Sequence, residues 1–198
     1  MRITDWIVRP ATVDDAQGLA VCHIESWREA YRGLVPDHLL DAFDTTRSTQ
    51  QWTRIITELP NATDSSAAAA ERRTLLVAVA DKPETAIPAS VRPGPRGAEI
   101  LGFAHAGPPR DNPRVADREL YALYLRAARY GTGIAQELMR AILLPDTDTA
   151  LWVFEENPRA RSFYRKFGFA ADGAHRIEPF SAASEIRMVA RRGITERR

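Results

Sequence analysis

The chain has 198 residues, of which 44% are hydrophobic and 27% are charged, and its formal net charge is +1. This length favours one folded domain, and so high an apolar fraction excludes a largely disordered chain. A protein dedicated to nucleic acids usually carries a large basic excess or a basic block, and this sequence has neither. We therefore expect no nucleic-acid partner.

Cys22 is the single cysteine of the chain. It excludes an intramolecular disulfide and a cysteine-rich zinc module, and it fits a reducing compartment. The first residues lack the apolar stretch of a signal peptide, and no run of about 18 apolar residues is present that could span a membrane. We expect a cytoplasmic protein that binds neither a metal ion nor a membrane.

Helical and strand periodicities divide the first half of the chain. Thr12 and Asp15 have the spacing of a helix N-cap, and the apolar residues after them recur at helical spacing as far as Tyr31. Gly33 and Pro36 end this helix. The predicted elements are a strand at 7–9, helices at 16–31, 36–40 and 45–59, and strands at 74–79 and 100–106.

The second half predicts alternating strands and helices. Its elements are a strand at 119–125, a helix at 134–144, a strand at 150–154, a helix at 158–167, and strands at 169–172 and 185–190. Asn157 is the expected N-cap of the second helix, and Pro158 suits its first turn. The order β-α-α-α-β-β-β-α-β-α-β-β indicates a mixed α/β fold in a single domain over 1–198, with a loop-rich segment at 60–98.

Gly131 and Gly133 follow a predicted strand and precede a helix. Glycine lets the backbone turn sharply and lets a ligand approach its N–H groups, and a helix N-terminus favours a phosphate. A strand-to-helix turn that merely needs glycine explains the same residues equally well, because short glycine motifs are common.

Asn157 and Tyr164 lie seven residues apart, so they share one face of the predicted helix. A tyrosine hydroxyl is a competent proton donor. Taken alone, however, Tyr164 is better explained as a half-buried packing residue.

In this order the two motifs resemble the GCN5-related N-acetyltransferase (GNAT) superfamily. The family's motif Gln/Arg-x-x-Gly-x-Gly/Ala falls on Tyr130 to Ala135, and its Asn-x-x-Ala-x-x-x-Tyr segment falls on Asn157, Ala160 and Tyr164. Tyr130 departs from the pattern, because the family has Gln or Arg there. The resemblance covers all but 60–98, and it implies a mixed, mostly antiparallel sheet flanked by helices and acetyl-CoA as acyl donor.

The resemblance also implies roles for individual residues. Backbone groups of Leu123, Tyr124 and Leu125 would hold the pantetheine arm and the thioester. The turn and the start of the next helix would cradle the pyrophosphate through backbone N–H groups: Tyr130, Gly131, Thr132, Gly133, Ile134, Ala135 and Gln136. Asn157 would contact the arm of the cofactor, and Tyr164 would protonate the departing CoA thiolate.

An acceptor ammonium must also lose a proton before it attacks a thioester. Glu119 lies six residues before Leu125, the distance at which histone-acetylating members of the family carry their base, so the resemblance makes Glu119 the candidate base, acting through water. A solvated strand-end carboxylate accounts for Glu119 equally well. Other relatives place a glutamate five residues before the asparagine; here that position is Trp152, which cannot take a proton.

His23, Trp27 and Tyr31 are spaced four apart on one helical face. In the family this helix walls the acceptor site, so the three residues are candidates for an aromatic pocket that takes an amine by cation–π contact. Packing of the helix on the sheet explains them too, above all Trp27, and His23 is more often a structural histidine than a base.

The resemblance therefore predicts an acetyl-CoA-dependent enzyme that acetylates a primary amine of a small molecule by direct attack in a ternary complex. A protein N-terminus or lysine is the alternative acceptor. Two further alternatives are a non-catalytic CoA-binding domain and an NAD-dependent oxidoreductase, for which the Gly131-Thr132-Gly133 turn and Glu155 match part of the dinucleotide pattern. Relatives are often dimers, which leaves a homodimer open.

Overall fold

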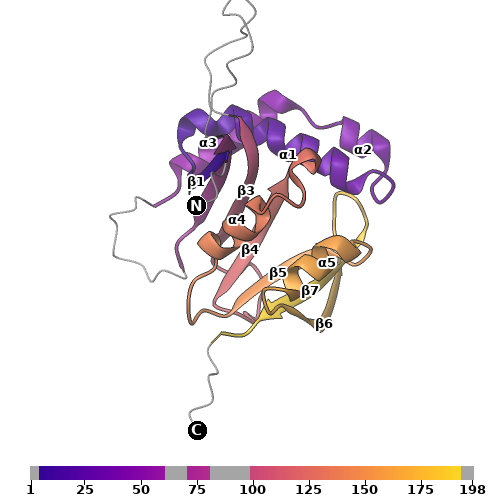
Figure 1. Ribbon diagram of the computed structural model, residues 1–198. Coiled ribbons are helices and arrows are strands. Elements are labelled where there is room, and N and C mark those ends of the chain that lie inside the picture. The colour runs from indigo at the N-terminus through magenta and orange to yellow at the C-terminus, as the bar shows by residue number, and fades with distance from the viewer. Residues whose placement is uncertain (1–4, 61–70, 81–98, 193–198) are drawn as a thin grey trace, which may run out of the picture.

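One mixed sheet organises the chain in a computed structural model that describes residues 5–60, 71–80 and 99–192 (Figure 1). Seven strands of this described part form it in the order β1-β2-β3-β4-β5-β7-β6. Their bounds are β1 Trp6–Pro10, β2 Thr74–Ala80, β3 Ile100–Gly107, β4 Arg118–Leu125, β5 Thr149–Phe154, β6 Ala170–Ile177 and β7 Ser184–Ala190. Neighbouring strands are antiparallel except β4 and β5, which are parallel.

The helices occupy both faces of this sheet, as Figure 1 shows. They are α1 Ala16–Tyr31, α2 Asp37–Asp41, α3 Thr45–Thr57, α4 Ile134–Ile142 and α5 Pro158–Arg165, with short 3-10 turns η1 Val13–Asp15 and η4 Ala127–Arg129. The predicted element order and the mixed, mostly antiparallel fold are both confirmed. The predicted loops at 61–70 and 81–98 lie outside the described residues.

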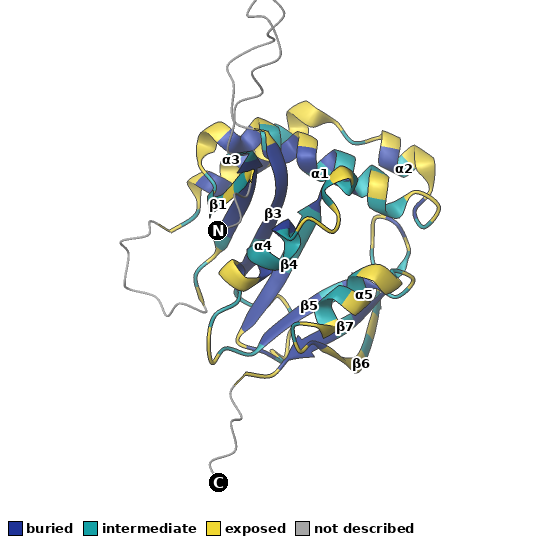
Figure 2. Ribbon diagram, in the orientation of Figure 1, coloured by how far each residue is buried: buried dark blue, intermediate teal, exposed yellow. Residues whose placement is uncertain are grey.

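Alternating side chains of the central strands build two cores. On β2, Leu75, Val77 and Val79 pack with α1 and α3, whereas Leu76 and Ala78 pack with α4. A strand that is covered on both faces needs an unbroken apolar run, so β2 can be predicted as a strand from its sequence alone. Figure 2 shows the result: the middle of the sheet is buried, and the helices expose only their outer faces.

Asp15 secures the entry into α1. Its Oδ2 accepts the Thr12 N–H at 2.8 Å, and both of its oxygens accept from the guanidinium of Arg9, at 2.7 and 2.8 Å. Burial alone would raise the pKa of Asp15, but these hydrogen bonds outweigh it and the pKa is lowered. The predicted capping spacing of Thr12 and Asp15 is therefore used, although it begins η1 rather than α1 directly.

Helix α3 ends at Thr57 and not at 59, and three further predicted boundaries were wrong for local reasons. Helix α4 ends at Ile142 and not at 144, because the backbone turns extended at Leu143, ahead of Pro145. Helix α5 ends at Arg165 and not at 167, and Gly168 follows at φ +84°. Strand β6 runs to Ile177 past a register shift, and its exposed polar residues carry no apolar alternation that sequence analysis could detect.

None of the helices within 5–60, 71–80 and 99–192 has both the length and the apolar character that crossing a bilayer requires.

Candidate active site

The two parallel strands of the sheet, β4 and β5, separate halfway along β4. β4 pairs with β5 only over Arg118–Leu120, opposite Thr149–Leu151, and then continues to Leu125. On its other side β4 stays paired with β3 throughout this stretch, with Gly102 opposite Leu125. Backbone groups of residues 123–125 that point away from β3 therefore face the widening gap between β4 and β5, where a ligand can take them as hydrogen-bond partners.

The glycine turn that follows β4 is shaped for an anion. Gly131 and Gly133 have φ of +77° and +104°, and Gly133 is the N-cap of α4. A Cβ at Gly131 would meet no atom within 4 Å, so its backbone conformation and not crowding calls for glycine. The first backbone bond of α4 runs from Glu137 N–H to the Gly133 carbonyl, which leaves the amides of residues 134–136 without a helical acceptor.

Tyr130, the residue that departs from the family motif, is paired with a cation. The guanidinium of Arg159 lies 3.9 Å from the centre of the Tyr130 ring and donates to its hydroxyl at 3.0 Å. Arg159 stands in the first turn of α5, two residues after Asn157, the predicted contact for the arm of the cofactor. Asn157 uses its Oδ1 to accept the Ala160 N–H at 3.0 Å, so its amide NH₂ is left for a ligand. Arg159 was missed by sequence analysis; the unusual Tyr130 was the available signal.

Tyr164 projects from α5 into the same region. Its ring packs against Phe163 and Phe169, with centroids 5.6 and 6.0 Å away. Burial raises the pKa of Tyr164 well above its ordinary value, and the nearby Tyr31 adds to the rise. The hydroxyl makes no hydrogen bond with another described residue and remains protonated at neutral pH.

The three aromatic residues predicted on α1 converge on Tyr124 of β4. The ring centroids of His23, Trp27 and Tyr31 lie 5.1, 6.3 and 6.3 Å from that of Tyr124. The hydroxyls of Tyr31 and Tyr124 are 3.3 Å apart, and burial raises the pKa of both. Burial lowers the pKa of His23 to about 4, so its imidazole is neutral. The structure thus brings these predicted residues together.

A small pocket opens beside this cluster, between α1 and α3. Its volume is about 230 Å³. His23 and Trp27 line it together with Phe43 and Asp44, and Tyr31 does not. Tyr31 instead faces Phe154, the last residue of β5, with ring centroids 4.7 Å apart. The three predicted acceptor residues therefore do not all line one pocket.

Glu119 is placed apart from this cluster. It lies opposite Ala150 in the paired part of β4 and β5, before the strands separate. Only 2% exposed, its carboxylate accepts from Arg110 three times: from the backbone N–H at 2.8 Å, from Nε at 3.0 Å and from Nη2. To take a proton from the substrate, the Glu119 carboxylate would have to give up hydrogen bonds from Arg110.

A second buried carboxylate, which was not identified from the sequence, lies on the side of this aromatic cluster. Glu185 of β7 is 9% exposed and stands directly opposite Phe154 of β5. Opposed residues of an antiparallel pair point to the same face, so Glu185 shares the face of Phe154 and Tyr31. Its charge raises the pKa of both Tyr31 and Tyr124, which places it within electrostatic reach of both hydroxyls. A glutamate at the start of a mostly apolar strand was the signal in the sequence.

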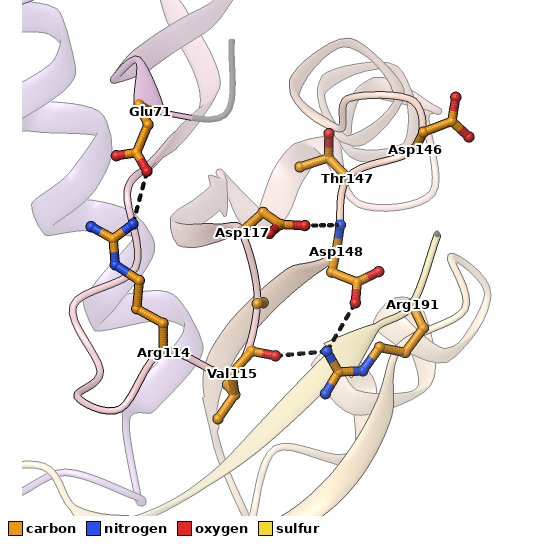
Figure 3. A pocket seen from close by; sticks show the side chains of 9 residues that line it. Glu71, Arg114, Val115, Asp117, Asp146, Thr147, Asp148 and Arg191 are labelled. Atoms are coloured by element: carbon orange, nitrogen blue, oxygen red, sulfur yellow. Dashed lines mark hydrogen bonds and ion pairs between the residues drawn. The ribbon is translucent and has the colours of Figure 1, made fainter. Parts of the chain in front are cut away.

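A larger polar hollow of about 590 Å³ lies at the other end of β4 and β5, where both strands begin (Figure 3). Its charges satisfy one another: Arg114 pairs with Glu71 at 2.8 Å, and Arg191 pairs with Asp148 at 2.9 Å. Asp117 accepts the backbone N–H of Asp148 at 3.2 Å. These contacts fasten the strand ends together, and none of the candidate site residues lines the hollow.

A separated parallel strand pair with a glycine turn before the next helix defines an acyl-CoA-dependent transferase site, and comparison with known proteins agrees. The model of the acetyltransferase (GNAT) domain matches residues 73–171, so the chain belongs to the GNAT acetyltransferase family. This confirms the resemblance found in the sequence and leaves the oxidoreductase alternative without support. The donor of these enzymes is acetyl-CoA.

Individual relatives carry the same activity in their names. The chain is 25% identical over 156 residues to YuaI of Bacillus subtilis, an uncharacterized N-acetyltransferase, covering 76% of this chain and 73% of the relative. It is 26% identical over 176 residues to a probable N-acetyltransferase of Mycobacterium tuberculosis, covering 87% and 84%. The PaiA N-acetyltransferase of Thermoplasma acidophilum, solved with coenzyme A, shares the fold with a TM-score of 0.62 at 18% identity, covering 95% of this chain and 99% of that one.

Proposed function

We propose that the protein transfers the acetyl group of acetyl-CoA to the primary amine of a small molecule. The observation that carries this choice is an aromatic bridge next to Trp27, whose ring packs against Tyr124. Phe180, between β6 and β7, lies 6.2 Å from the ring of Trp27 and 5.3 Å from that of Phe43, which precedes α3. A peptide acceptor needs an extended open groove, whereas a small amine fits beneath side chains that meet in this way.

The backbone supplies most of the donor site in this proposal. Acetyl-CoA brings an acyl group activated as a thioester. The amides of residues 123–125 that face the gap between β4 and β5 would hold its arm and polarise the thioester carbonyl. The amides from Gly131 to Gln136 would cradle the pyrophosphate, and the free NH₂ of Asn157 would contact the arm.

Proton handling falls to side chains around the same gap. Tyr164 keeps its proton because its pKa is raised, so its hydroxyl is available to the departing thiolate. The role of Glu119 as base stays a prediction; it requires that Arg110 release the carboxylate or that water link it to the acceptor. A protein lysine or N-terminus is the second acceptor class, favoured only if the bridge of Phe43 and Phe180 opens.

The donor half of the proposal is tested by thermal unfolding with acetyl-CoA, CoA and NADH in parallel. A ligand that binds only the folded state stabilises it by RT ln(1 + [L]/Kd), about 2.7 kcal/mol at a hundredfold excess over Kd. Acetyl-CoA and CoA should raise the melting temperature and NADH should not. A melting temperature that is raised by NADH alone would show that the protein does not bind acetyl-CoA as proposed.

The acceptor half is tested by release of free thiol. Purified protein and acetyl-CoA are incubated with primary alkylamines, with the corresponding alcohols, and with a peptide that carries a lysine and a free N-terminus. Faster thiol release with an alkylamine than with the peptide supports the small-molecule acceptor. If the peptide alone is acetylated, the acceptor is a protein and not the small-molecule amine proposed here.

A further inference from the structure

We propose that Glu185 binds the acceptor's ammonium and takes its proton, and that the acceptor is a monoamine with an aromatic or apolar tail. This inference rests on the proposed function and adds to it the base and the substrate class. Its starting point is a carboxylate whose surroundings do not satisfy it.

Glu185 is buried yet makes few bonds. Its Oε2 accepts from Nε of Arg176 at 2.6 Å, and this is its one hydrogen-bond donor among the described residues. A buried carboxylate has room for about four hydrogen bonds on its two oxygens, and leaving such a group short of partners is costly. By contrast, both oxygens of Glu119 are engaged by Arg110. Glu185 therefore retains an acceptor oxygen, Oε1, for a cation.

Neighbouring side chains hold Glu185 in place without occupying both of its carboxylate oxygens. Arg176 lies opposite Glu185 on β6, and its guanidinium stacks 4.3 Å from the centre of the Trp152 ring. Trp152 of β5 is on the same face of the sheet, two residues from Phe154. Stacking fixes the direction of Arg176, and Arg176 in turn fixes Oε2, so we regard Arg176 as a positioning residue.

The charged and titratable groups around Glu185 come from five elements. They are Arg176 of β6, Tyr31 of α1, Tyr124 of β4 and, through Tyr124, Tyr164 of α5. Arg187, two residues along β7 on the same face, is already paired with Asp111 and Asp172. The three tyrosines have raised pKa values and stay neutral. Since Arg176 offsets the charge of Glu185 only through Oε2, the carboxylate can still receive an ammonium beside the hydroxyl pair of Tyr31 and Tyr124.

The aromatic side chains near Glu185 determine the tail of the acceptor. They come from α1, β4, β5 and two connecting segments and pack on one another: Trp27, Tyr31, Phe43, Tyr124, Phe154 and Phe180. Aromatic faces attract one ammonium and cover an apolar tail, but they give a second cation no counter-ion. The other buried carboxylate of this face, Glu119, already accepts from Arg110 through both oxygens, so Glu185 is the one left for an ammonium and a monoamine fits better than a polyamine.

The proton balance of the transfer follows from this arrangement. The ammonium gives one proton to Glu185 and becomes a neutral amine. Its nitrogen forms a bond to the acyl carbon as the carbon–sulfur bond breaks, and the departing thiolate receives a proton through Tyr164. The second proton of the nitrogen leaves as the amide forms, so that acetylated amine, free thiol and one released proton are the products.

The test compares Glu185→Gln with Glu119→Gln in the full-length protein, with 2-phenylethylamine as acceptor, 2-phenylethanol as its neutral analogue and spermidine as a polyamine. Glu156→Gln, which removes an exposed carboxylate before α5, is the control for charge. We expect Glu185→Gln to lower kcat/KM for 2-phenylethylamine about a hundredfold, or about 2.7 kcal/mol. Calorimetric titration of this amine into the CoA complex should show weaker binding, with the CoA-induced melting shift unchanged.

Several results would overturn the assignment. Unchanged activity and amine affinity in Glu185→Gln would do so, as would the full loss appearing in Glu119→Gln instead. Spermidine preferred over 2-phenylethylamine would refute the monoamine class. If Glu185→Gln gives no folded protein, Glu185→Asp decides: it keeps the charge, and undiminished turnover would count against a positioned base. A native protein that binds CoA but acetylates none of these amines would refute the proposed function itself.

Discussion

The phenolic hydroxyls of Tyr31 and Tyr124 lie 3.3 Å apart, although 93 residues separate the two in the chain. One stands at the end of α1 and the other on the part of β4 that has left β5. Their contact joins the segment that would hold the donor to the helix that would wall the acceptor.

Replacing Tyr31 with Phe removes this hydrogen bond and keeps the aromatic ring. Because a typical hydrogen bond contributes about 1 kcal/mol, we expect kcat/KM for the acceptor to fall about fivefold. The affinity for CoA should stay within twofold, which equilibrium dialysis would measure. Tyr121→Phe is the matched control, since that hydroxyl bonds to the Pro108 carbonyl away from the cluster. An equal loss in both variants would show that the effect is not specific to the pair.

Tyr164→Phe tests the proton donor for the leaving group. General acid catalysis typically contributes about 10² to 10⁴ in rate, so turnover should fall by at least a hundredfold. The ring packing against Phe169 is retained, and the melting temperature with CoA should therefore match that of the native protein. Turnover that persists within threefold would mean that the thiolate leaves without help from Tyr164.

The pair of Tyr130 and Arg159 supplies a cation where the family motif carries Gln or Arg on the turn itself. We expect Arg159→Ala to weaken CoA binding about five- to thirtyfold, as the loss of one charge-assisted contact implies. The double variant Tyr130→Arg with Arg159→Ala should recover much of the affinity. The difference between native and Arg159→Ala should also shrink in high salt. Arg54→Ala, on the exposed side of α3, controls for a general loss of positive charge.

The residues that the resemblance assigns to the donor lie in short stretches of chain, which a sequence motif can capture. The segments 123–125 and 131–136 and the pair Asn157 and Tyr164 are such stretches, and their role in holding the donor stays a prediction. Gly131 and Gly133 were predictable because positive φ demands glycine whatever surrounds it.

The proposed acceptor half depends on contacts between distant strands, which spacing does not reveal. Glu185 shares a face with Phe154, the residue that packs on Tyr31, only because β7 pairs with β5 in this register. Glu119 carries the expected sequence separation from Leu125, yet its environment is decided by Arg110 on the preceding connection. The end of β6 was missed for a related reason, because an exposed edge strand has no buried face to produce an apolar pattern.

His23 and His105 make the fold sensitive to mild acid. Burial lowers the pKa of each to about 4, while an unfolded histidine titrates near 6.5. The unfolded chain therefore binds more protons between these values, so stability is full above about pH 6.5 and falls as the pH drops towards 4. Each histidine should contribute a slope of up to about 1.4 kcal/mol per pH unit. Urea unfolding from pH 4.5 to 7.5 measures this.

Variants distinguish the contributions of His23 and His105 to this pH dependence. His105→Gln should flatten the pH dependence of unfolding by roughly half, and His38→Gln, which alters an exposed residue of α2, should leave it unchanged. A slope that is the same in His105→Gln and in the native protein would mean that other groups govern the acid sensitivity.

Gly102 keeps β3 close to the part of β4 that faces the gap. A Cβ placed there would lie 2.7 Å from the backbone oxygen of Tyr124 and 2.7 Å from a methyl carbon of Leu125. A backbone oxygen cannot turn aside, so Gly102→Ala must push the two strands apart. We expect a loss of about 1–3 kcal/mol in unfolding free energy, the usual range for overpacking, and weaker CoA binding.

Gly107→Ala on the same strand is the matched control for Gly102→Ala. Its Cβ would be just as crowded, at 2.7 Å from the Tyr121 hydroxyl and 2.9 Å from Cγ of Arg73, but both neighbours are side-chain atoms that can move. Urea unfolding and CoA affinity should therefore change less than in Gly102→Ala. If the two variants lose CoA affinity equally, the position of residues 123–125 does not depend on the contact with Gly102, and the backbone of β4 must be held from the side of α4 instead.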